Sequence, residues 1–150
     1  FFVSVLDGRC VGFISCSDCY GRAVGVDVAK FQKQFGFVKG FAAGKAVKAE
    51  FCTPLPYPDT VGYIDLVAVD EDFRGRHIAT KMLETVIRET PYLSYILDVT
   101  DINTGAQRCY QNFGFHEVGR KKVSLARMKG FKEKIYMEFI KGDTRDANTI

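Results

Sequence analysis

The segment 61–87 most constrains the fold, because it joins a strand pattern to a helix pattern through one short basic turn. Residues 61–69 are rich in β-forming side chains and stay apolar on both faces past Asp65, which predicts a central, covered strand. An apolar stripe with helical spacing starts at Ile78, and Pro91 stops it. This order is typical of an open α/β sheet, which binds ligands at the carboxyl ends of its strands.

The basic turn has the composition of an anion site. Arg74, Gly75, Arg76 and His77 stand directly before the predicted helix, whose first N–H groups are unpaired and carry a partial positive charge. Hydrogen bonds from these groups to a phosphate, at about 1.5–3 kcal/mol each, outweigh a dipole term of about 0.3–1 kcal/mol. Neither the P-loop string nor the Rossmann string occurs, which argues against nucleoside triphosphates and NAD.

The remaining patterns extend the chain to an α/β fold, a mixed sheet of about six strands flanked by helices. The strand patterns cover 1–6, 10–15, 61–69, 95–100, 115–122 and 134–141, and the helix patterns cover 24–49, the stripe from Ile78, and 106–113 with Gly114 as its cap. Asp7-Gly8 predicts a two-residue hairpin turn, and the prolines of 53–59 predict a stiff connector.

Domain organisation follows from the same patterns. We expect one domain over 1–142, with 17–60 as an insertion between the second hairpin strand and the central strand, and a polar tail over 143–150. Glycines within 24–49 make a break in that helix plausible. The strand pattern begins at residue 1, which is Phe rather than Met. We therefore expect that N-terminal elements of the fold are missing from this sequence.

Composition excludes several classes of partner. A net charge of +3 and a pI near 8.6, with Lys and Arg spread along the chain, do not favour a nucleic acid partner. No apolar run reaches the roughly 20 residues that span a bilayer, so no membrane partner is expected. Five cysteines without disulfide-rich density predict reduced thiols, and Cys16 and Cys19 lack a second ligand pair for a metal. We expect a soluble, cytoplasmic protein without metal.

The turn also resembles the acetyl-CoA motif of the GNAT superfamily of N-acetyltransferases, written Gln/Arg-x-x-Gly-x-Gly/Ala. Arg74 and Ala79 match, and His77 replaces the first motif glycine. Residues 64–70 look like the fourth strand of the family. A second signature of the family is similar to Asn103, Ala106, Tyr110 and Phe113-Gly114-Phe115. The resemblance covers 61–122 closely and the opening hairpin and final strand loosely.

The resemblance implies the GNAT acyl-CoA N-acyltransferase fold and acetyl-CoA as co-substrate. It implies that the fourth and fifth strands of the family splay apart. The pantetheine arm would then contact Val67, Ala68 and Val69 through the backbone, and an N–H near Val67 or Ala68 would face the thioester oxygen. The pyrophosphate would bind to Arg74, Gly75, Arg76, His77, Ile78, Ala79 and Thr80.

The resemblance also makes Tyr110 the general acid that protonates the departing thiolate, and Asn103 a pantetheine contact. Asn103 and Tyr110 are two helical turns apart, so they share one helix face about 10 Å apart along the axis. A phenol with a pKa of about 10 keeps its proton at neutral pH and can give it to a thiolate. The alternatives are a core aromatic for Tyr110 and a helix N-cap for Asn103.

Two positions leave alternatives open. We expect Asp65 to share a strand face with Val67. From that position it can act as the general base, either directly or through a water. The alternative is that Asp65 is a solvated residue at the strand end, and Asp98 offers no better base. We expect a helical conformation at His77, because the apolar stripe begins directly after it; a positive φ would cost about 1–2 kcal/mol. Its imidazole leans either over the phosphates or out to solvent.

The acceptor is the least constrained part of the prediction. The first hypothesis is an N-acetyltransferase that acts on the primary amine of a small molecule. The second is the same fold acting on a protein or peptide amine, and the third is an acyl-CoA-binding module without turnover. The insertion 17–60 is a candidate wall of the acceptor site or a homodimer contact; its lysines favour an acidic acceptor or form a solvated helix face.

Overall fold

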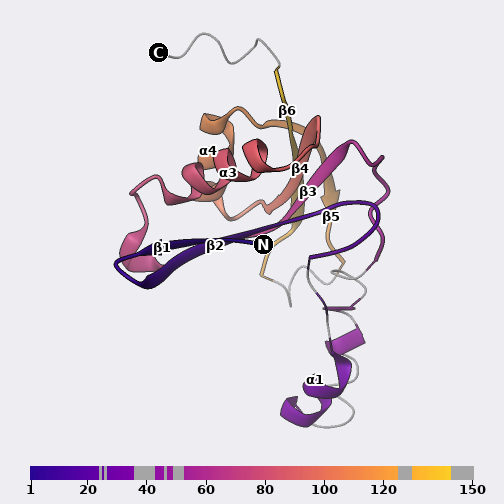
Figure 1. Ribbon diagram of the computed structural model, residues 1–150. Helices are drawn as coiled ribbons and strands as arrows, with labels where there is room; N and C mark the ends of the chain where they lie inside the picture. The colour runs from indigo at the N-terminus through magenta and orange to yellow at the C-terminus, as the bar shows by residue number, and fades with distance from the viewer. Residues whose placement is uncertain are drawn as a thin grey trace.

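The computed structural model of the protein describes residues 1–23, 25, 27–35, 43–45, 47–48, 53–124 and 130–142 (Figure 1). Its centre is a mixed six-stranded sheet with the strand order β1-β2-β3-β4-β6-β5, in which only β3 and β4 run parallel. The strands are β1 (Phe2–Leu6), β2 (Arg9–Ser17), β3 (Val61–Val69), β4 (Ser94–Thr100), β5 (His116–Lys122) and β6 (Glu133–Ile140). The prediction of a mixed sheet of about six strands is confirmed.

The described helices are α1 (Val28–Phe35), α3 (Ile78–Glu89), α4 (Thr104–Phe113) and the short 3-10 helix η1 (Glu71–Phe73). The predicted helix over 24–49 is confirmed in part, since α1 and the helical residues 43–45 and 47–48 fall within it. Residues 24, 26, 36–42, 46 and 49–50 lie outside the described residues, as does the predicted tail 143–150. No described helix has both the length and the apolar character needed to cross a membrane.

The main core lies between one face of the sheet and the helices α3 and α4. Met82, Leu83 and Val86 of α3 are buried against sheet residues such as Ile14 and Leu97. The apolar stripe of α3 repeats at three- and four-residue steps, so one side of the helix covers the sheet while the other meets solvent. A smaller cluster on the opposite face of the sheet contains Val61, Tyr63 and Ile96.

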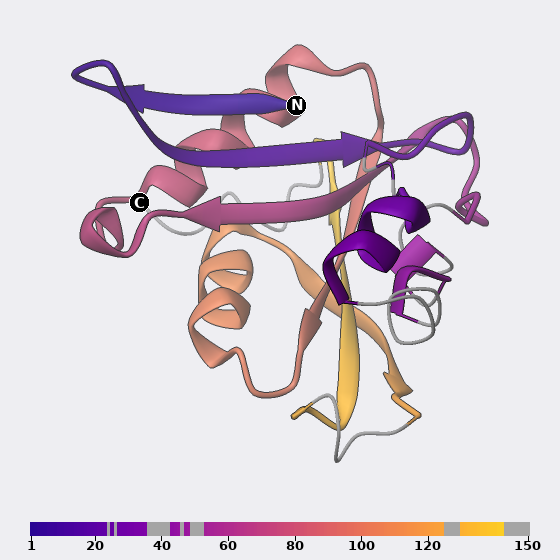
Figure 2. The same cartoon turned by 90° about the horizontal axis from the view of Figure 1, so that it is seen from below.

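Strands β3 and β4 pair over only part of their length. Their parallel ladder runs from Val61 opposite Ser94 to Ile64 opposite Leu97, whereas β3 continues to Val69. Past this ladder the two strands diverge, and in Figure 2 β3 and β6 run in clearly different directions with α4 on one side between them. The splay implied by the family resemblance is therefore present, and it leaves one edge of β3 without a neighbouring strand.

A β-bulge in β3 changes which residues share a face. Ser15 of β2 lies opposite Leu66, but Cys16 lies opposite Ile64, so Asp65 is the extra residue on β3. As a result Val67 and Val69 pack against the main core together with Ile64. The expectation that Asp65 shares a face with Val67 and Val69 is wrong, because the bulge shifts the alternation by one residue.

Candidate functional site

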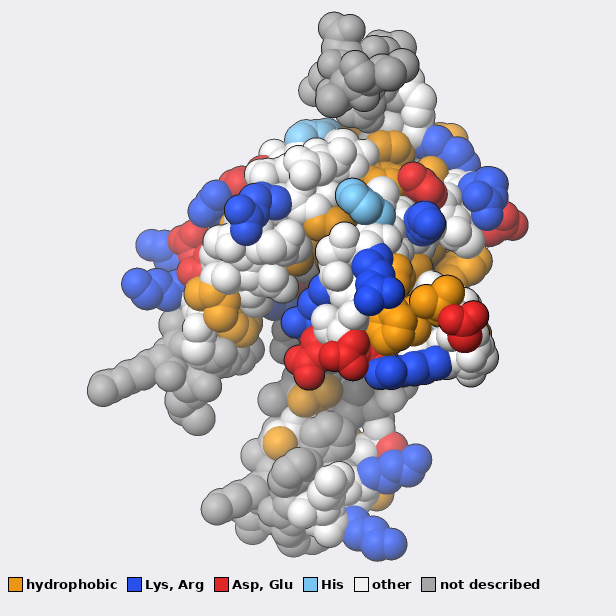
Figure 3. Space-filling model, turned by 90° about the vertical axis from the view of Figure 1, so that its left-hand side faces the viewer, with side chains coloured by type: hydrophobic (Ala, Val, Ile, Leu, Met, Phe, Trp, Pro, Cys, Tyr) orange, Lys and Arg blue, Asp and Glu red, His pale blue; other side chains and the backbone are white. Residues whose placement is uncertain are grey.

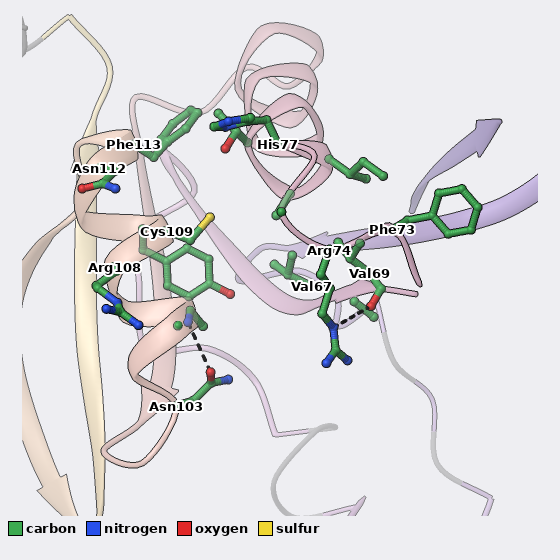
Figure 4. A pocket seen from close by; sticks show the side chains of 18 residues that line it. Val67, Val69, Phe73, Arg74, His77, Asn103, Arg108, Cys109, Asn112 and Phe113 are labelled. Atoms are coloured by element: carbon green, nitrogen blue, oxygen red, sulfur yellow. Dashed lines mark hydrogen bonds between the residues drawn. The ribbon is translucent and has the colours of Figure 1, made fainter. Parts of the chain in front are cut away.

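A cavity of about 1020 Å³ lies between the diverging end of β3, the start of α3 and one side of α4. We call it the β3–α4 cleft. In Figure 4, Val67, Val69, Arg74 and His77 border it on one side and Asn103, Arg108, Cys109 and Phe113 of α4 on the other. The lining residues from the predicted cofactor set are Val67, Ala68, Val69, Arg74, Gly75, His77, Ile78, Ala79, Thr80 and Asn103. The structure thus brings together every member of that set except Arg76.

The start of α3 forms one end of the cleft. The first intrahelical bond is donated by the N–H of Lys81 to the carbonyl of His77 at 3.0 Å. The N–H groups of Ile78, Ala79 and Thr80 precede this bond, so the helix itself gives them no acceptor. These three amides and the helix dipole make the end of the cleft favourable for an anion.

His77 is the N-cap of α3 and has a left-handed backbone, with φ 57° and ψ 21°. The expected helical conformation is wrong: the chain must reverse direction sharply to enter α3, and His77 takes the positive φ that the turn requires. A non-glycine residue there costs about 1–2 kcal/mol. The imidazole is exposed and makes no cap hydrogen bond, and it extends across the cleft toward α4 (Figure 4).

The other turn residues divide into two groups. Gly75 has φ +75°, and a methyl group added to its Cα would meet no heavy atom within 4 Å, so backbone angle rather than crowding favours glycine there. Arg74 lines the cleft, and its Nε donates to the Val69 carbonyl at 3.3 Å. Arg76 is not among the residues that line the cleft, and its guanidinium lies over the Phe73 ring at 5.0 Å.

Asn103, the N-cap of α4, and Tyr110, within α4, line the cleft opposite β3. The side-chain oxygen of Asn103 accepts a hydrogen bond from the N–H of Ala106 at 3.2 Å, which confirms its N-cap role. Tyr110 lies two turns further along and is 8% exposed. Burial, with smaller contributions from Cys109 and Asp98, raises the pKa of Tyr110 to about 12. Tyr110 is therefore a neutral donor at physiological pH.

Asp65 lies outside the β3–α4 cleft. Its side chain is fully buried and is paired with the guanidinium of Arg22 and the hydroxyl of Ser17. It lines a second cavity on the other face of the sheet, where Tyr63 and Asp98 also lie. The structure therefore separates the two predicted catalytic residues, Tyr110 and Asp65, onto opposite faces.

The cleft also contains residues for which the sequence predicted no role in binding. They are Phe73, Gly105, Ala106, Arg108, Cys109, Asn112 and Phe113. Those on α4 follow from helix geometry, since Gly105, Arg108, Cys109 and Asn112 stand at i, i+3, i+4 and i+7 on one helix face. Counted from Asn103, the same spacing leads to Ala106, Gln107 and Tyr110, so it could have found Ala106 but not Arg108 or Asn112.

The charged side chains on the face drawn in Figure 3 do not indicate one class of partner. Figure 3 shows Lys and Arg side chains interspersed with Asp and Glu rather than gathered into a broad basic surface. Among the described residues, no group of three or more His, Cys, Asp or Glu side chains is placed to hold a metal ion. The described cysteines Cys10, Cys16, Cys19 and Cys109 are free thiols.

Comparison of the sequence with known protein families assigns the chain to one of them. The sequence profile of the Acetyltransferase (GNAT) family matches residues 1–115, about three quarters of the chain. A search of curated proteins by sequence found no match.

Several solved structures share the fold. Ard1 from Thermoplasma volcanium has a TM-score of 0.59 at 22% identity, covering 92% of this chain and 68% of that one. Ribosomal-protein-alanine N-acetyltransferase from Brucella melitensis has a TM-score of 0.56 at 19% identity, covering 92% and 66%. A GNAT family acetyltransferase from Elizabethkingia anophelis with acetyl-CoA bound has a TM-score of 0.50 at 19% identity, covering 57% and 63%. The chain therefore spans about two thirds of the length of these neighbours, and by the profile match it belongs to the GNAT family of acetyltransferases.

Proposed function

We propose that the protein transfers the acetyl group of acetyl-CoA to the primary amine of a small molecule, by direct attack of the amine in a ternary complex. The observation that carries this proposal is that the predicted cofactor residues, Arg76 excepted, line one cleft together with Tyr110. Membership of the GNAT family and the acetyl-CoA bound in the Elizabethkingia anophelis neighbour support it. When bound, acetyl-CoA supplies an activated acyl group and a thiol leaving group.

The start of α3 is the proposed pyrophosphate site. The N–H groups of Ile78, Ala79 and Thr80 have no intrahelical acceptor, and Arg74 adds a positive charge at the edge of the cleft. Each charge-assisted hydrogen bond contributes about 1.5–3 kcal/mol. Main-chain amides therefore account for most of the binding energy, and an exposed His77 beside them does not prevent it.

The free edge of β3 is the proposed site of the pantetheine arm and of the reacting carbonyl. Residues Val67, Ala68 and Val69 lie beyond the ladder with β4, so the edge of β3 that faces β4 is available for pairing. An N–H of Val67 or Ala68 would donate to the oxyanion that forms when the amine attacks. Removing one such donor slows related reactions by about 10²–10³.

Tyr110 is the proposed general acid. As the amine nitrogen bonds to the carbonyl carbon, the C–S bond breaks and its electron pair leaves with sulfur. The phenol of Tyr110 gives its proton to that sulfur, and the proton lost by the acceptor nitrogen passes through solvent and restores the phenol. The raised pKa of Tyr110, about 12, keeps the group protonated until this step.

The general base has less support from the geometry. Asp65 is held by Arg22 and Ser17 on the opposite face from the cleft, so its carboxylate is committed to an ion pair. Our proposal needs no side-chain base if the amine arrives neutral or loses its proton to water. A base role for Asp65 stays a prediction, which its variant tests below.

One experiment tests the proposal. The protein is mixed with acetyl-CoA and a panel of small amines and peptides, and free thiol release is followed together with the thermal unfolding midpoint. We expect stabilisation by acetyl-CoA and thiol release with at least one small amine. Stabilisation without any thiol release would point to a binding module without turnover, and no stabilisation at all would contradict the cofactor site.

A protein or peptide amine is the second candidate. The Brucella melitensis neighbour that shares the fold is named as a ribosomal-protein-alanine N-acetyltransferase, which keeps this acceptor class in view. Thiol release with peptides but not with small amines would favour it over the first candidate.

A further inference from the structure

A second cavity, of about 470 Å³, lies on the face of the sheet opposite the β3–α4 cleft. We call it the charged pocket. Its lining includes Asp65 of β3 and Asp98 of β4, each of which directly follows the last residue of the β3–β4 ladder, Ile64 and Leu97. The charged pocket therefore adjoins the point where the two strands separate, and the β3–α4 cleft adjoins the same gap from the other side.

The carboxylates of the charged pocket are already neutralised. Asp65 pairs with the guanidinium of Arg22, whose side chain is 11% exposed. Asp98 pairs with the ammonium of Lys134 at 3.0 Å and accepts a hydrogen bond from the hydroxyl of Tyr63. Each negative charge thus has a cation in contact, so the acidic residues do not leave an unpaired negative charge for a ligand ammonium.

The rim of the charged pocket carries positive charge without such partners. Lys121 and Lys122 line the pocket and are exposed, and in the part of the chain that the structure describes neither pairs with a carboxylate. The sequence from 118 to 132 contains no Asp or Glu, and Glu133, which lies opposite Lys122 in the β5–β6 register, pairs with Arg120. A positive rim over a neutral floor favours a ligand that carries negative charge.

The floor also contains a donor that lacks an acceptor. The Nε of Arg22 is buried and has no hydrogen-bond partner among the described residues. Its guanidinium lies over the ring of Tyr63 at 5.3 Å, and Tyr63 stacks with Tyr57 at 5.9 Å between ring centroids. This donor is enclosed, and the other two nitrogens of Arg22 already bond to Asp65 and to the Thr53 carbonyl. Arg22 therefore holds the floor of the charged pocket in place, and the charge available to a ligand is that of the rim lysines.

We propose that the charged pocket holds the acceptor, and that the acceptor is a small amine that also carries a carboxylate, of the size of a single amino acid. This inference rests on the proposed function. The carboxylate lies toward Lys121 and Lys122 of β5, and the amine lies toward the gap between β3 and β4. The volume of about 470 Å³ is near the lower end of ligand pockets, which suits a compact acceptor.

The experiment compares acceptors that differ only in charge, namely amino acids and their amides, with thiol release as the readout. The amine of an amide loses its proton more readily, so intrinsic reactivity favours the amide. We expect kcat/KM to favour the free acid by about tenfold or more, which is about 1.4 kcal/mol. Equal values, or a preference for the amide or for acidic peptides, would overturn the inference.

Charge reversal at the rim gives the matched test. Lys121→Glu with Lys122→Glu should lower kcat/KM for the acid at least tenfold, while kcat/KM for the amide and KM for acetyl-CoA stay the same. Arg88→Glu is the control, because Arg88 lies on α3 with a 67% exposed side chain, away from both cavities. Equal losses for acid and amide would contradict the inference.

A binding readout separates this inference from the proposed function. In the presence of coenzyme A, the free acid should raise the unfolding midpoint, and the double lysine variant should remove that shift. Binding without thiol release would overturn acetyl transfer but support the anionic pocket. Thiol release from amines without any binding preference for the acid would support transfer and overturn the pocket assignment.

Discussion

The two cavities on either side of the β3–β4 gap offer a ligand different kinds of contact. The β3–α4 cleft offers main-chain amides, apolar side chains and the neutral phenol of Tyr110. The charged pocket is lined by ion pairs, tyrosine rings and exposed lysines. Backbone groups cannot be changed by substitution, whereas side-chain charges can. The cleft therefore suits the proposed co-substrate, and the charged pocket suits the proposed acceptor.

The largest effect is expected from Asp65→Asn, which tests whether the ion pair of the charged pocket is structural. The substitution leaves the guanidinium of Arg22 buried without its counter-charge, so the free energy of unfolding should fall by about 3 kcal/mol. Chemical denaturation monitored by circular dichroism measures the change.

Asp72→Asn is the matched control. Asp72 and Arg9 are 3.7 Å apart with side chains 71% and 57% exposed, so this loss should be at most about 1 kcal/mol. Similar losses of unfolding free energy in the two variants would show that the buried pair of Asp65 and Arg22 contributes no more to stability than an exposed pair. A fall in kcat for folded Asp65→Asn with KM values unchanged would support Asp65 as general base.

Tyr110→Phe tests the cleft side of the comparison. We expect kcat to fall about a hundredfold, since the leaving thiolate loses its proton donor, while KM for acetyl-CoA stays nearly unchanged. Because burial raises the pKa of Tyr110 to about 12, turnover of the unmodified protein should not fall through loss of this proton until the pH approaches that value. Steady-state thiol release over a range of pH measures both.

The exposed Tyr20, which is 82% accessible, provides the control for removal of a hydroxyl. Tyr20→Phe should leave kcat unchanged. If Tyr110→Phe behaves like Tyr20→Phe, Tyr110 is a core aromatic without a catalytic role.

Substitutions at Asn103 distinguish its role as the N-cap of α4 from a role in contacting the co-substrate. Loss of the hydrogen bond to the Ala106 N–H should lower the free energy of unfolding by about 1 kcal/mol. Asn103→Asp keeps the cap, so stability should be retained. If Asn103 also contacts the pantetheine arm, Asn103→Asp should raise KM for acetyl-CoA; an unchanged KM would leave only the cap.

The smallest effect is expected at His77. His77→Gly removes a side chain from a left-handed position, so the free energy of unfolding should rise by about 1 kcal/mol. The affinity for acetyl-CoA should change by no more than about tenfold, or about 1.4 kcal/mol. Calorimetry with acetyl-CoA and denaturant unfolding measure the two quantities.

Arg76→Gly is the control, since Arg76 is not among the described residues with positive φ. That variant should not gain stability. Complete loss of acetyl-CoA binding in His77→Gly would mean that the imidazole, rather than the amides of α3, holds the pyrophosphate.

The sequence predicted the β3–α4 cleft better than the charged pocket, and the reason is physical. The cleft is built from contiguous segments whose periodicity and turn residues report their own structure, as at Ile78 and Gly114. The pair between Arg22 and Asp65 joins residues that are 43 positions apart, so no local pattern reveals it. The charged pocket therefore depends on contacts between residues far apart in the sequence, which local patterns do not report.

Two local features were also missed. The bulge at Asp65 is not visible in the sequence, because residues on both sides of it are apolar and fit either register. The positive φ at His77 was missed because a non-glycine residue rarely adopts it, and the apolar stripe directly afterwards suggested a helix. Both errors lie where the chain departs from regular structure next to the candidate site.

The short β3–β4 ladder has a mechanical consequence. It is the only backbone ladder that joins β1–β3 to β4–β6 within the described sheet, and it spans Val61 to Ile64. A force that pulls the two groups of strands apart is carried across the sheet mainly by this ladder, with the hydrogen bond from Tyr63 to Asp98 and the core side chains as the other support. Under load, the sheet should therefore part first along this line, and each group of strands should keep its own antiparallel pairing longer than the two stay joined.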